Sequence, residues 1–399
     1  MSEWKKVKLG EIASAIQTGP FGSQLHQSDY SDIGVPVVMP KDIINGRIDE
    51  STIARVESHH IERLSRHKIS EGDILYARRG DVGKCAYTVF AQQGWLCGTG
   101  CLRVTIDKEK AFPKFIFFQL QKRETIGWVE KHAIGATMLN LNTSILGDVP
   151  IELPPLYIQH RIATILSRYD SLIENYQKQI KLLEEAAQRL YKEWFVDLHF
   201  PGHETTKIID GVPEGWEKKA ISQLGEYLNG FAFKPSDWQE SGKPIIKIKE
   251  MGNGVGNETP RNNGERVPAK YLIKQGDLLF SWSATLMVIV WSGEEGWLNQ
   301  HLFKVTPSEG IGREFLLQSI SYTIEEFQNL TTGSTMKHIQ RNKLDQVFVN
   351  VPNGEIMKLY SDIAEKTREQ ILRLSSQIRL LTEARDRLLP KLMSGEIAV

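Results

Sequence analysis

Two glycine-containing patterns in this 399-residue chain approach the motifs that hold phosphate groups, and each lacks a feature that the motif requires. Residues 78–85 contain a Gly-Lys pair, but Arg78 stands where a phosphate-binding loop begins with glycine, and Cys85 stands where the loop needs serine or threonine. The Gly-x-Gly-x-Gly pattern at 252–256 is followed by no long amphipathic helix, which a dinucleotide-binding fold requires. We therefore predict no nucleotide site at either place, and a flexible hairpin at 252–256.

The cysteine, proline and histidine patterns also indicate no catalytic or metal centre. Cys97 and Cys101 lack the second ligand pair of a structural zinc site, so buried thiols are the better interpretation. The Leu-Pro-Pro-Leu run at 153–156 lacks the amide or carboxylate and the aromatic ring that flank Pro-Pro in amino-methyltransferase loops, and we interpret it as the end of a strand. The histidines, His301 among them, stand in no motif. The sequence predicts no catalytic residue, no metal ligand and no cofactor bound by this chain.

Basic and amide side chains gather in several stretches, and they suit recognition rather than catalysis. Arg78, Arg79 and Lys84 follow a predicted strand, and residues 331–344 carry basic side chains with no acidic one. In the major groove of DNA, arginine reads guanine and asparagine or glutamine reads adenine, while lysine contacts phosphates. For any one of these residues, a solvated loop is the competing interpretation. The candidate DNA contacts are Ser23, Lys41, Arg78, Arg79, Lys84, Asn140, Asn142, Lys234, Lys247, Lys249, Trp282, Lys337, His338, Gln340 and Arg341.

The chain contains an internal repeat, which indicates how these stretches are positioned. At one constant offset, the residues Gly135, Thr137 and Met138 fall on Gly333, Thr335 and Met336, and the match continues without a gap through Gln179–Leu190 and Gln377–Leu388. Upstream, the offset drifts, yet Gly72–Ala77 still matches Gly276–Ser281. Each copy therefore reads as a variable globular part followed by a constant tail.

Each tail has the apolar period of a long coiled-coil helix. In the first copy the apolar positions alternate in steps of four and three, which is the a/d period, and the second copy follows the same phase with three weaker positions. Taken alone, this pattern fits an oligomerisation stalk or a buried helix as well as it fits a spacer between two globular parts. Because the units are duplicated, a pseudo-two-fold arrangement with the two helices antiparallel is the simplest pairing. The predicted seam residues are Leu166, Ile173, Ile180, Leu183, Leu190, Ile371, Leu374, Ile378, Leu381 and Leu388.

The composition bounds the class of protein. With 41% hydrophobic and 25% charged residues, the chain is an ordinary globular protein, and its length predicts two or three domains. Its three cysteines cannot form a disulfide framework, which fits a reducing compartment. The N-terminus has no signal-peptide core, and the longest apolar run, 284–291, is far below the ~20 residues that span a bilayer. We expect a cytoplasmic protein without a membrane partner.

The charge balance excludes one mode of DNA binding. The 49 basic and 49 acidic residues cancel, and no region of the chain is strongly basic. A protein that grips DNA by bulk charge needs a basic excess. We therefore expect weak DNA binding by the isolated chain, with local basic loops reading bases and partner proteins supplying most of the backbone contacts.

The fold class predicted from these patterns is α+β, a mixed α/β chain of two globular domains, each followed by a long helix. Short Val-, Ile- and aromatic-rich runs bounded by Gly, Pro, Asp and Asn predict strands. They are 35–39, 74–77, 102–106, 245–249, 278–282 and 303–305, while 112–122 and 314–327 read as helices and 133–147 as a loop and a strand. The expected divisions are 1–155, 156–200, 201–353 and 354–399.

This constellation resembles the specificity (S, HsdS) subunits of type I restriction-modification systems. The order and duplication of several phrases carry the likeness over essentially the whole chain. They are Gly-Pro-Phe-Gly-Ser at 19–23, the run from Gly72 to Lys84, Gly-Thr-Gly-Cys-Leu-Arg at 98–103, the run from Gly135 to Ser144, and Gly-Val-Pro-Glu-Gly-Trp at 211–216. The second copy departs from the first after Met336, where Lys-His-Ile-Gln replaces Leu-Asn-Leu-Asn.

The resemblance implies a function and partners. It implies two target-recognition domains, an antiparallel coiled coil of spacer helices, and an asymmetric bipartite site in double-stranded DNA. It also implies two methyltransferase (M) subunits that use S-adenosylmethionine, and restriction and translocase (R) subunits that cut, so this chain itself is no enzyme. The competing interpretations are a stand-alone DNA methyltransferase or nuclease with a diverged site, and a coiled-coil interaction scaffold.

Overall fold

The computed structural model describes residues 4–135, 139–283, 285–329 and 341–399, except for the side chain of Arg341. The chain forms two compact units. Unit 1 comprises Met1–Ser171 with Thr382–Val399, and unit 2 comprises Leu172–Leu381. Helix α6 (Leu156–Tyr191) and helix α10 (Gly354–Met393) each contribute to both units. No helix among the described residues has the length and apolar character needed to cross a membrane.

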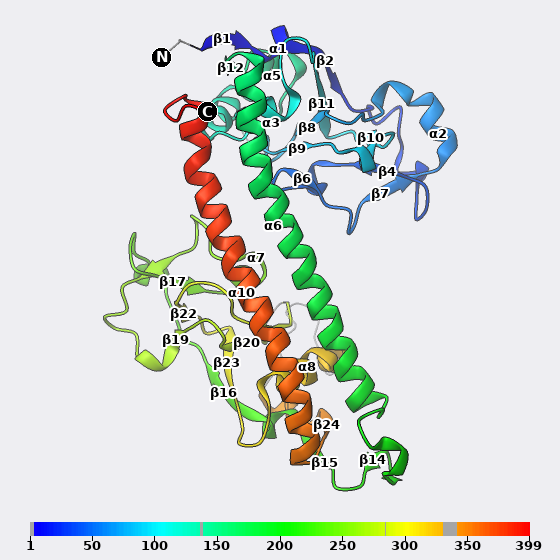
Figure 1. Ribbon diagram of the computed structural model, residues 1–399, viewed down its shortest axis with the longest axis vertical. Coiled ribbons are helices and arrows are strands. Elements are labelled where there is room, and N and C mark those ends of the chain that lie inside the picture. The colour runs from blue at the N-terminus through cyan, green and yellow to red at the C-terminus, as the bar shows by residue number, and fades with distance from the viewer. Residues whose placement is uncertain (1–3, 136–138, 284, 330–340) are drawn as a thin grey trace. The chain divides into compact units, whose positions relative to one another are not determined.

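Unit 1 is built on two four-stranded sheets (Figure 1). One sheet has the order β2-β11-β8-β9 and is antiparallel, and the other has the order β10-β4-β7-β3 with β10 and β4 parallel. The strands are β1 (Lys5–Lys8), β2 (Ala13–Thr18), β3 (Tyr30–Ser31), β4 (Val35–Val38), β5 (Ile43–Ile44), β6 (Arg47–Ile48), β7 (Ala54–Val56), β8 (Ile74–Ala77), β9 (Cys85–Tyr87), β10 (Leu96–Cys97), β11 (Cys101–Ile106) and β12 (Pro150–Leu153). The shorter helices are α1 (Leu9–Ile12), α2 (Ser58–Arg63), α3 (Pro113–Leu120), α4 (Arg123–His132) and α5 (Thr143–Gly147).

Unit 2 repeats this plan. Its sheet β16-β23-β20-β21 corresponds to β2-β11-β8-β9, and its sheet β18-β17-β22-β19 again contains one parallel pair, β17 with β22. The strands are β13 (Ile208–Ile209), β14 (Val212–Pro213), β15 (Glu217–Ala220), β16 (Gly225–Asn229), β17 (Lys243–Ile246), β18 (Arg261–Asn262), β19 (Leu272–Ile273), β20 (Leu278–Ser281), β21 (Met287–Val290), β22 (Gly296–Leu298), β23 (Leu302–Pro307) and β24 (Phe348–Val351). The shorter helices are α7 (Ile248–Asn253), α8 (Arg313–Tyr322) and α9 (Ile324–Asn329).

The central strand of each main sheet is buried on both faces. In β8, Ile74 and Tyr76 enter one core while Leu75 and Ala77 enter another, because successive side chains of a strand point to opposite faces. In β20, Leu278 and Phe280 likewise separate from Leu279. Because both faces of β8 and of β20 are packed, the position of the residue that follows each strand is fixed.

Each unit also contains one end of each long helix. In unit 1, Ile162 and Leu166 of α6 share a core with Leu392 and Met393 of α10. Figure 1 shows the start of α6 near the end of α10. In unit 2, Tyr191 of α6 shares a core with the early residues of α10. In both units the beginning of one helix thus meets the end of the other, so the helices pair antiparallel.

The predicted seam residues differ in how deeply they are buried. Leu166, Ile173, Ile371 and Leu374 are buried, whereas the remaining six are half-buried: Ile180, Leu183, Leu190, Ile378, Leu381 and Leu388. Arg385, a polar residue in the phase of the seam, donates from Nη1 to Asp170 Oδ1 at 2.8 Å within unit 1. An aliphatic side chain is therefore replaced there by an ion pair.

Four local predictions were wrong. The predicted strand at 245–249 ends at Ile246, and α7 then contains Gly252 in place of a hairpin. The predicted helix at 314–327 breaks at Thr323, whose hydroxyl donates to the backbone carbonyl of Ser319. The segment 133–147, predicted as a loop and a strand, ends in helix α5. In each case a side-chain or capping contact selected a conformation that the apolar pattern alone does not specify.

Candidate nucleic-acid interface

Arg78 directly follows the central strand β8 and is held by backbone contacts on both sides. Its N–H donates to the carbonyl oxygen of Gly100 at 2.8 Å, and its own carbonyl oxygen accepts from the N–H of Leu141 at 2.8 Å. The guanidinium carbon lies 5.8 Å from the ring centroid of Phe21. The Nε atom is buried and has no hydrogen-bond partner among the described residues. The backbone of Arg78 is thus fixed on both sides, and no acceptor for its Nε lies among the described residues.

Two further candidates lie beside Arg78. Arg79 is exposed and forms an isolated antiparallel bridge with Asn140, and the side-chain Oδ1 of Asn140 is buried without a hydrogen-bond partner among the residues that the structure describes. Phe21 is 55% exposed, and the exposed Ser23 lies in the same loop. The fold therefore brings together candidates from three separate stretches of the sequence.

A glycine makes this arrangement possible. Gly19 directly follows strand β2, and a Cβ atom placed on it would lie 1.9 Å from the carbonyl oxygen of Gly98. Only a residue without a side chain allows the two backbones to approach so closely. The N–H of Gly19 also donates to the carbonyl oxygen of Cys101 at 2.9 Å. The backbone that leads to Phe21 is therefore held against the 98–101 loop.

Unit 2 has the same close approach of two backbones, between the end of β16 and the loop before β23. A Cβ atom on Gly230 would lie 2.1 Å from the carbonyl oxygen of Asn299, and the N–H of Gly230 donates to the carbonyl oxygen of Leu302 at 3.0 Å. The residue that follows β20 is Trp282. Trp282 therefore occupies the place in unit 2 that Arg78 occupies in unit 1.

The side chains around Trp282 differ from those around Arg78. The indole Nε1 donates to Asn229 Oδ1 at 3.3 Å, and the ring centroid lies 5.8 Å from that of His301. Gln300 Nε2 lies 3.4 Å from His301 Nε2. The loop that reads Gly-Thr-Gly at 98–100 in unit 1 thus reads Asn-Gln-His in unit 2. One site is built around a cation and the other around aromatic and amide groups.

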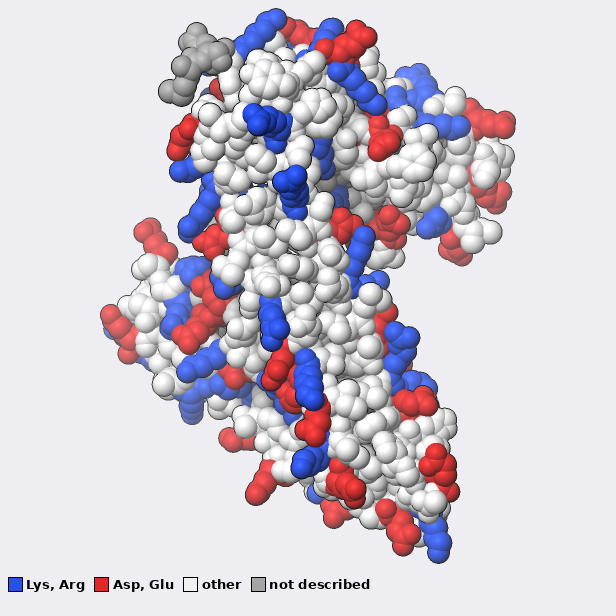
Figure 2. Space-filling view, viewed as in Figure 1, with Lys and Arg blue, Asp and Glu red and all other residues white. Residues whose placement is uncertain are grey.

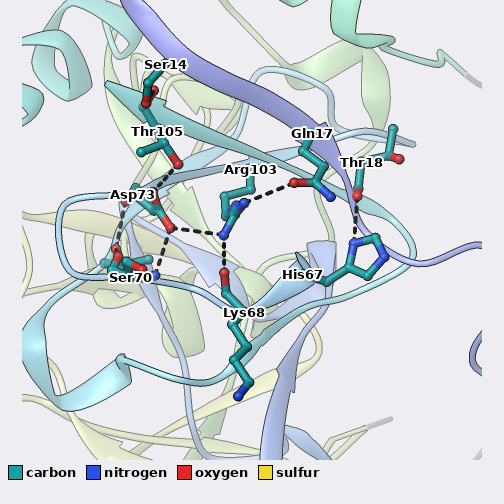
Figure 3. Close-up of polar contacts among 10 residues, drawn as sticks. Ser14, Gln17, Thr18, His67, Lys68, Ser70, Asp73, Arg103 and Thr105 are labelled. Atoms are coloured by element: carbon teal, nitrogen blue, oxygen red, sulfur yellow. Dashed lines mark hydrogen bonds and ion pairs between the residues drawn. The ribbon is translucent and has the colours of Figure 1, made fainter. Parts of the chain in front are cut away.

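A buried polar network holds the first site in place (Figure 3). Asp73 precedes β8, and its Oδ2 accepts from the backbone N–H of Ser70 at 2.8 Å while its Oδ1 accepts from the Thr105 hydroxyl at 2.5 Å. Arg103 of β11 lies 3.8 Å from the same carboxylate and donates to the carbonyl of Lys68. Asp73 is 1% exposed, so this network is structural and joins the neighbouring strands β8 and β11.

Unit 2 contains the equivalent network. Lys304 Nζ lies 3.0 Å from Asp277 Oδ2 and donates to the carbonyl oxygen of Leu272 at 3.0 Å, while the N–H of Lys274 donates to Asp277 Oδ2 at 2.8 Å. Lys304 thus replaces Arg103, and Leu272 replaces Lys68 as the carbonyl partner. The ion pair and its contact with a backbone carbonyl are thus repeated in unit 2, whereas the side chains that follow β8 and β20 differ.

Other predicted contacts are engaged in their own local structure. Asn142 caps α5, accepting from the N–H of Ile145 at 2.8 Å, and its amide is therefore a structural group. The lysines Lys41, Lys84 and Lys249 pair with Asp42, Asp81 and Glu258, Lys247 lies over the Trp238 ring, and the backbone N–H of Lys234 donates to Asp237. Arg341 lies in a 3₁₀ turn, Arg341–Lys343, and Lys337, His338 and Gln340 lie outside the described residues.

The sequence analysis missed four residues of these two sites: Phe21, Asn229, Gln300 and His301. A signal existed for each of them. Aligning Gly19 with Gly230, and 98–102 with 299–303, places all four beside the candidates already named. The offset changes between these segments, which hid the match from a gap-free comparison.

Surface charge and thiol chemistry agree with a recognition role for these sites. Figure 2 shows Lys and Arg mixed with Asp and Glu over the visible face, with no continuous basic field. Cys85, Cys97 and Cys101 are free and buried, and burial raises the pKa of the Cys85 and Cys97 thiols to about 12, so these sulfurs stay protonated. Within the described ranges, no group of three or more His, Cys, Asp or Glu residues is placed to hold a metal ion.

Comparison with known proteins identifies the family. The family model "Type I restriction modification DNA specificity domain" matches twice, at residues 1–185 and 213–379. The MjaIX specificity subunit of a type I restriction enzyme from Methanocaldococcus jannaschii is 25% identical, with 99% of this chain and 93% of that protein covered. The HindI specificity subunit from Haemophilus influenzae is 23% identical over the full length of both chains. The crystal structure of an S subunit from M. genitalium has the same fold, with a TM-score of 0.57 at 16% identity, 98% of this chain and 96% of that chain being covered. Together with the duplicated fold, these matches show that the chain belongs to the family of type I restriction-modification specificity subunits, which supply DNA recognition and not catalysis.

Proposed function

We propose that each unit reads one half of an asymmetric bipartite DNA site in the major groove, and that the helix pair sets the spacing between the halves. The carrying observation is the pair of equivalent positions, Arg78 and Trp282, which follow corresponding strands in the same register beside equivalent glycine contacts and carry different chemistry. A protein that read a symmetric site would need the same side chains at both positions. Different side chains on one repeated frame fit two different half-sites.

The residues near Arg78 suit the donor and acceptor pattern of base edges. Arginine pairs with guanine O6 and N7, and asparagine with adenine N6 and N7. Arg78, Arg79 and Asn140 therefore act as the base-reading or phosphate-positioning group of unit 1. Lys84 makes only an exposed pair with Asp81, and such pairs contribute about 0–1 kcal/mol, so a DNA phosphate can compete for the ammonium group.

The methyltransferase and nuclease activities belong, in this proposal, to partner subunits. Two M subunits that use S-adenosylmethionine on adenine dock on the outer faces of the helix pair, and R subunits cut. Exposed apolar side chains on the helices support such docking, because large apolar groups in water are typical of surfaces that a partner covers. In unit 2 they are Leu172, Leu182, Leu359, Ile363 and Leu380, which are 42–61% exposed.

The spacer role is tested by lengthening both helices. Four residues inserted after Gln179 and four after its repeat equivalent Gln377 add about 6 Å of helix, against ~3.4 Å per base pair. We expect the preferred spacer to grow by one or two base pairs when methylated bases are mapped in cells that carry the variant and its M subunit. Linked readers bind well only when the half-sites match their span.

A matched control places the same four residues in the exposed turn at Gly310, where a Cβ atom added to the glycine would have no atom within 4 Å. This control should leave both half-sites and the spacer unchanged. If the helix insertions also leave the spacer unchanged while modification continues, the helix pair does not set the distance.

A further inference from the structure

We propose that an ion cluster between α8 and α10 holds the globular part of unit 2 (β15 to β24) at one angle on α10, and thereby determines how strictly one spacer length of the DNA site is selected. The cluster consists of Arg313, Glu314, Glu365 and Arg368. This inference rests on the proposed function, in which each unit reads one half-site and the helix pair sets the spacing. It adds residues that act on specificity through position and not through contact with a base.

The cluster is centred on a buried ion pair. Arg368 Nε donates to Glu314 Oε1 at 2.9 Å, and the two side chains are only 6% and 2% exposed. The Nε atom of Arg313 lies 3.6 Å from the same carboxylate oxygen. Arg313 also donates from Nη2 to Glu365 and from Nη1 to the carbonyl oxygen of Gly276, the latter at 3.1 Å. Two residues of α8 are thereby joined to two residues of α10 and to the loop before β20.

A buried ion pair of this kind is better suited to fix a geometry than to add stability. Burial raises the pKa of Glu314, and the charge of Arg368 offsets only part of this rise, so the ionised carboxylate is costly at this place. Apolar residues of similar volume are often as stable as a buried ion pair, whereas the charged pair requires one distance and one direction between its groups. Phe315 of α8 shares a core with Phe280 of β20, so the sheet of unit 2 follows α8. Fixing α8 on α10 therefore fixes the sheet.

The contact between α10 and the globular part continues in polar groups along one face of the helix. Gln275 Nε2 donates to Ser376 Oγ at 2.9 Å and lies 3.5 Å from the carbonyl oxygen of Leu372. An open hollow of about 550 Å³ lies beside these groups, lined by residues of α10 and by residues of the globular part. Close packing therefore does not fill this part of the contact. The residues of α10 that share this face, at steps of three and four, are Glu365, Arg368, Leu372 and Ser376.

The angle on α10 affects spacer selection because DNA is itself a helix. A spacer that is one base pair longer shifts the second half-site by ~3.4 Å and rotates it by about 35° around the DNA axis. A globular part that is fixed on its helix follows one such arrangement, whereas a globular part that can tilt also follows the neighbouring ones. The cluster is not repeated in unit 1, where the equivalent residues are Pro113, Lys114, Ser167 and Asp170.

The experiment replaces both buried partners by methionine, Glu314→Met together with Arg368→Met, in the full chain and maps methylated bases in cells that carry its M subunit. We expect modification at sites whose spacer is one base pair longer or shorter to rise about tenfold relative to the native spacer, while the bases of both half-sites stay the same. Arg368→Lys keeps both charges and should leave this ratio near its native value. Lys219→Met removes an exposed pair with Glu217 at 2.7 Å and is the control, which should also leave the ratio unchanged.

A second variant tests the same angle without changing a buried group. Gln275→Ala removes the contact of an exposed side chain with Ser376 of α10. Because one exposed hydrogen bond contributes less than the cluster, it should relax the spacer ratio by a smaller factor, about two- to fivefold. Co-purification with the M subunit establishes that each variant is folded, and Gln275→Ala decides the question if the double variant does not co-purify.

Several outcomes would overturn the inference. An unchanged spacer ratio in the folded double variant, or a loss of modification that is equal at every spacer, would show that the cluster does not select the spacer. A native chain that modifies neighbouring spacers as well as the main one would have no strict selection for the cluster to provide. A native map without a two-part consensus would instead reject the proposed function itself, which separates the two failures.

Discussion

The two units share a supporting frame, which consists of one ion pair and one glycine contact. They differ at the tip, which consists of the residue after β8 or β20 and the loop beside it. The pair Asp73–Arg103 in unit 1 corresponds to Asp277–Lys304 in unit 2, and Gly19 corresponds to Gly230. Beyond this frame, a Gly-Thr-Gly loop in unit 1 corresponds to Asn-Gln-His in unit 2. The difference teaches that the contacts that build the sheet are separate from the side chains at its tip. Duplication followed by change at the tip then yields two differently lined loops without a change of fold.

The largest expected difference concerns the buried carboxylate. Asp73 is 1% exposed and serves three partners, whereas the side chains of Asp277 and Lys304 are 25% and 23% exposed. Asp73→Ala leaves the Arg103 guanidinium, 16% exposed, without a carboxylate and should cost unit 1 about 3–5 kcal/mol. Asp277→Ala should cost unit 2 about 1–2 kcal/mol, because water reaches its partner. Hydrogen exchange measured separately for β8 and β20 gives the two values.

A matched control for both is Asp81→Ala, which breaks an exposed pair with Lys84 and should change exchange in β8 by less than about 1 kcal/mol. Equal losses for Asp73→Ala and Asp277→Ala would contradict the idea that burial separates the two frames.

The sequence predicted the larger features of this comparison. The repeat, the long helices, the mixed sheets and strands such as 74–77 follow from apolar period and from self-similarity, which both depend on many residues at once. It could not predict that Glu250 accepts from the N–H of Lys247 at the start of α7 or that Asn142 caps α5, because one side-chain hydrogen bond decides each. Nor could it predict which basic residues are paired, since Lys249 and Glu258 meet only through the fold.

The next comparison concerns the close contact of two backbones at Gly19 in unit 1 and at Gly230 in unit 2. Gly19→Ala places a Cβ atom 1.9 Å from a carbonyl oxygen, so the loop must shift, and overpacking of this kind costs about 1–3 kcal/mol. Gly230→Ala should cost a similar amount in unit 2, where the distance is 2.1 Å. Thermal unfolding and exchange in the 97–101 and 298–302 loops measure the effects. Gly22→Ala and Gly256→Ala, which have no atom within 4 Å of the new Cβ, are the controls and should be neutral.

The smallest expected effect is a pH dependence confined to unit 1. His67 is 2% exposed, its Nδ1 lies 3.0 Å from the Thr18 carbonyl oxygen, and its Nε2 is buried without a partner among the described residues. Burial lowers the pKa of His67, and the charges of Arg66 and Arg103 lower it further, although the Thr18 carbonyl acts in the opposite direction. The folded imidazole therefore stays neutral at a pH where the unfolded one is protonated.

The sign of the effect follows from proton binding. As the pH falls from about 6.5, the unfolded chain takes up a proton that the folded chain refuses until its lower pKa is reached, so unit 1 loses stability over that window. Unit 2 carries Tyr271 at the equivalent place, directly before Leu272. His67→Gln keeps an amide donor for the Thr18 carbonyl and removes the titration, so the exchange of β8 relative to β20 should become less dependent on pH. If that ratio varies with pH in His67→Gln as it does in the native chain, another group causes the dependence. If it varies in neither, the imidazole of His67 is as easily protonated in the fold as in water.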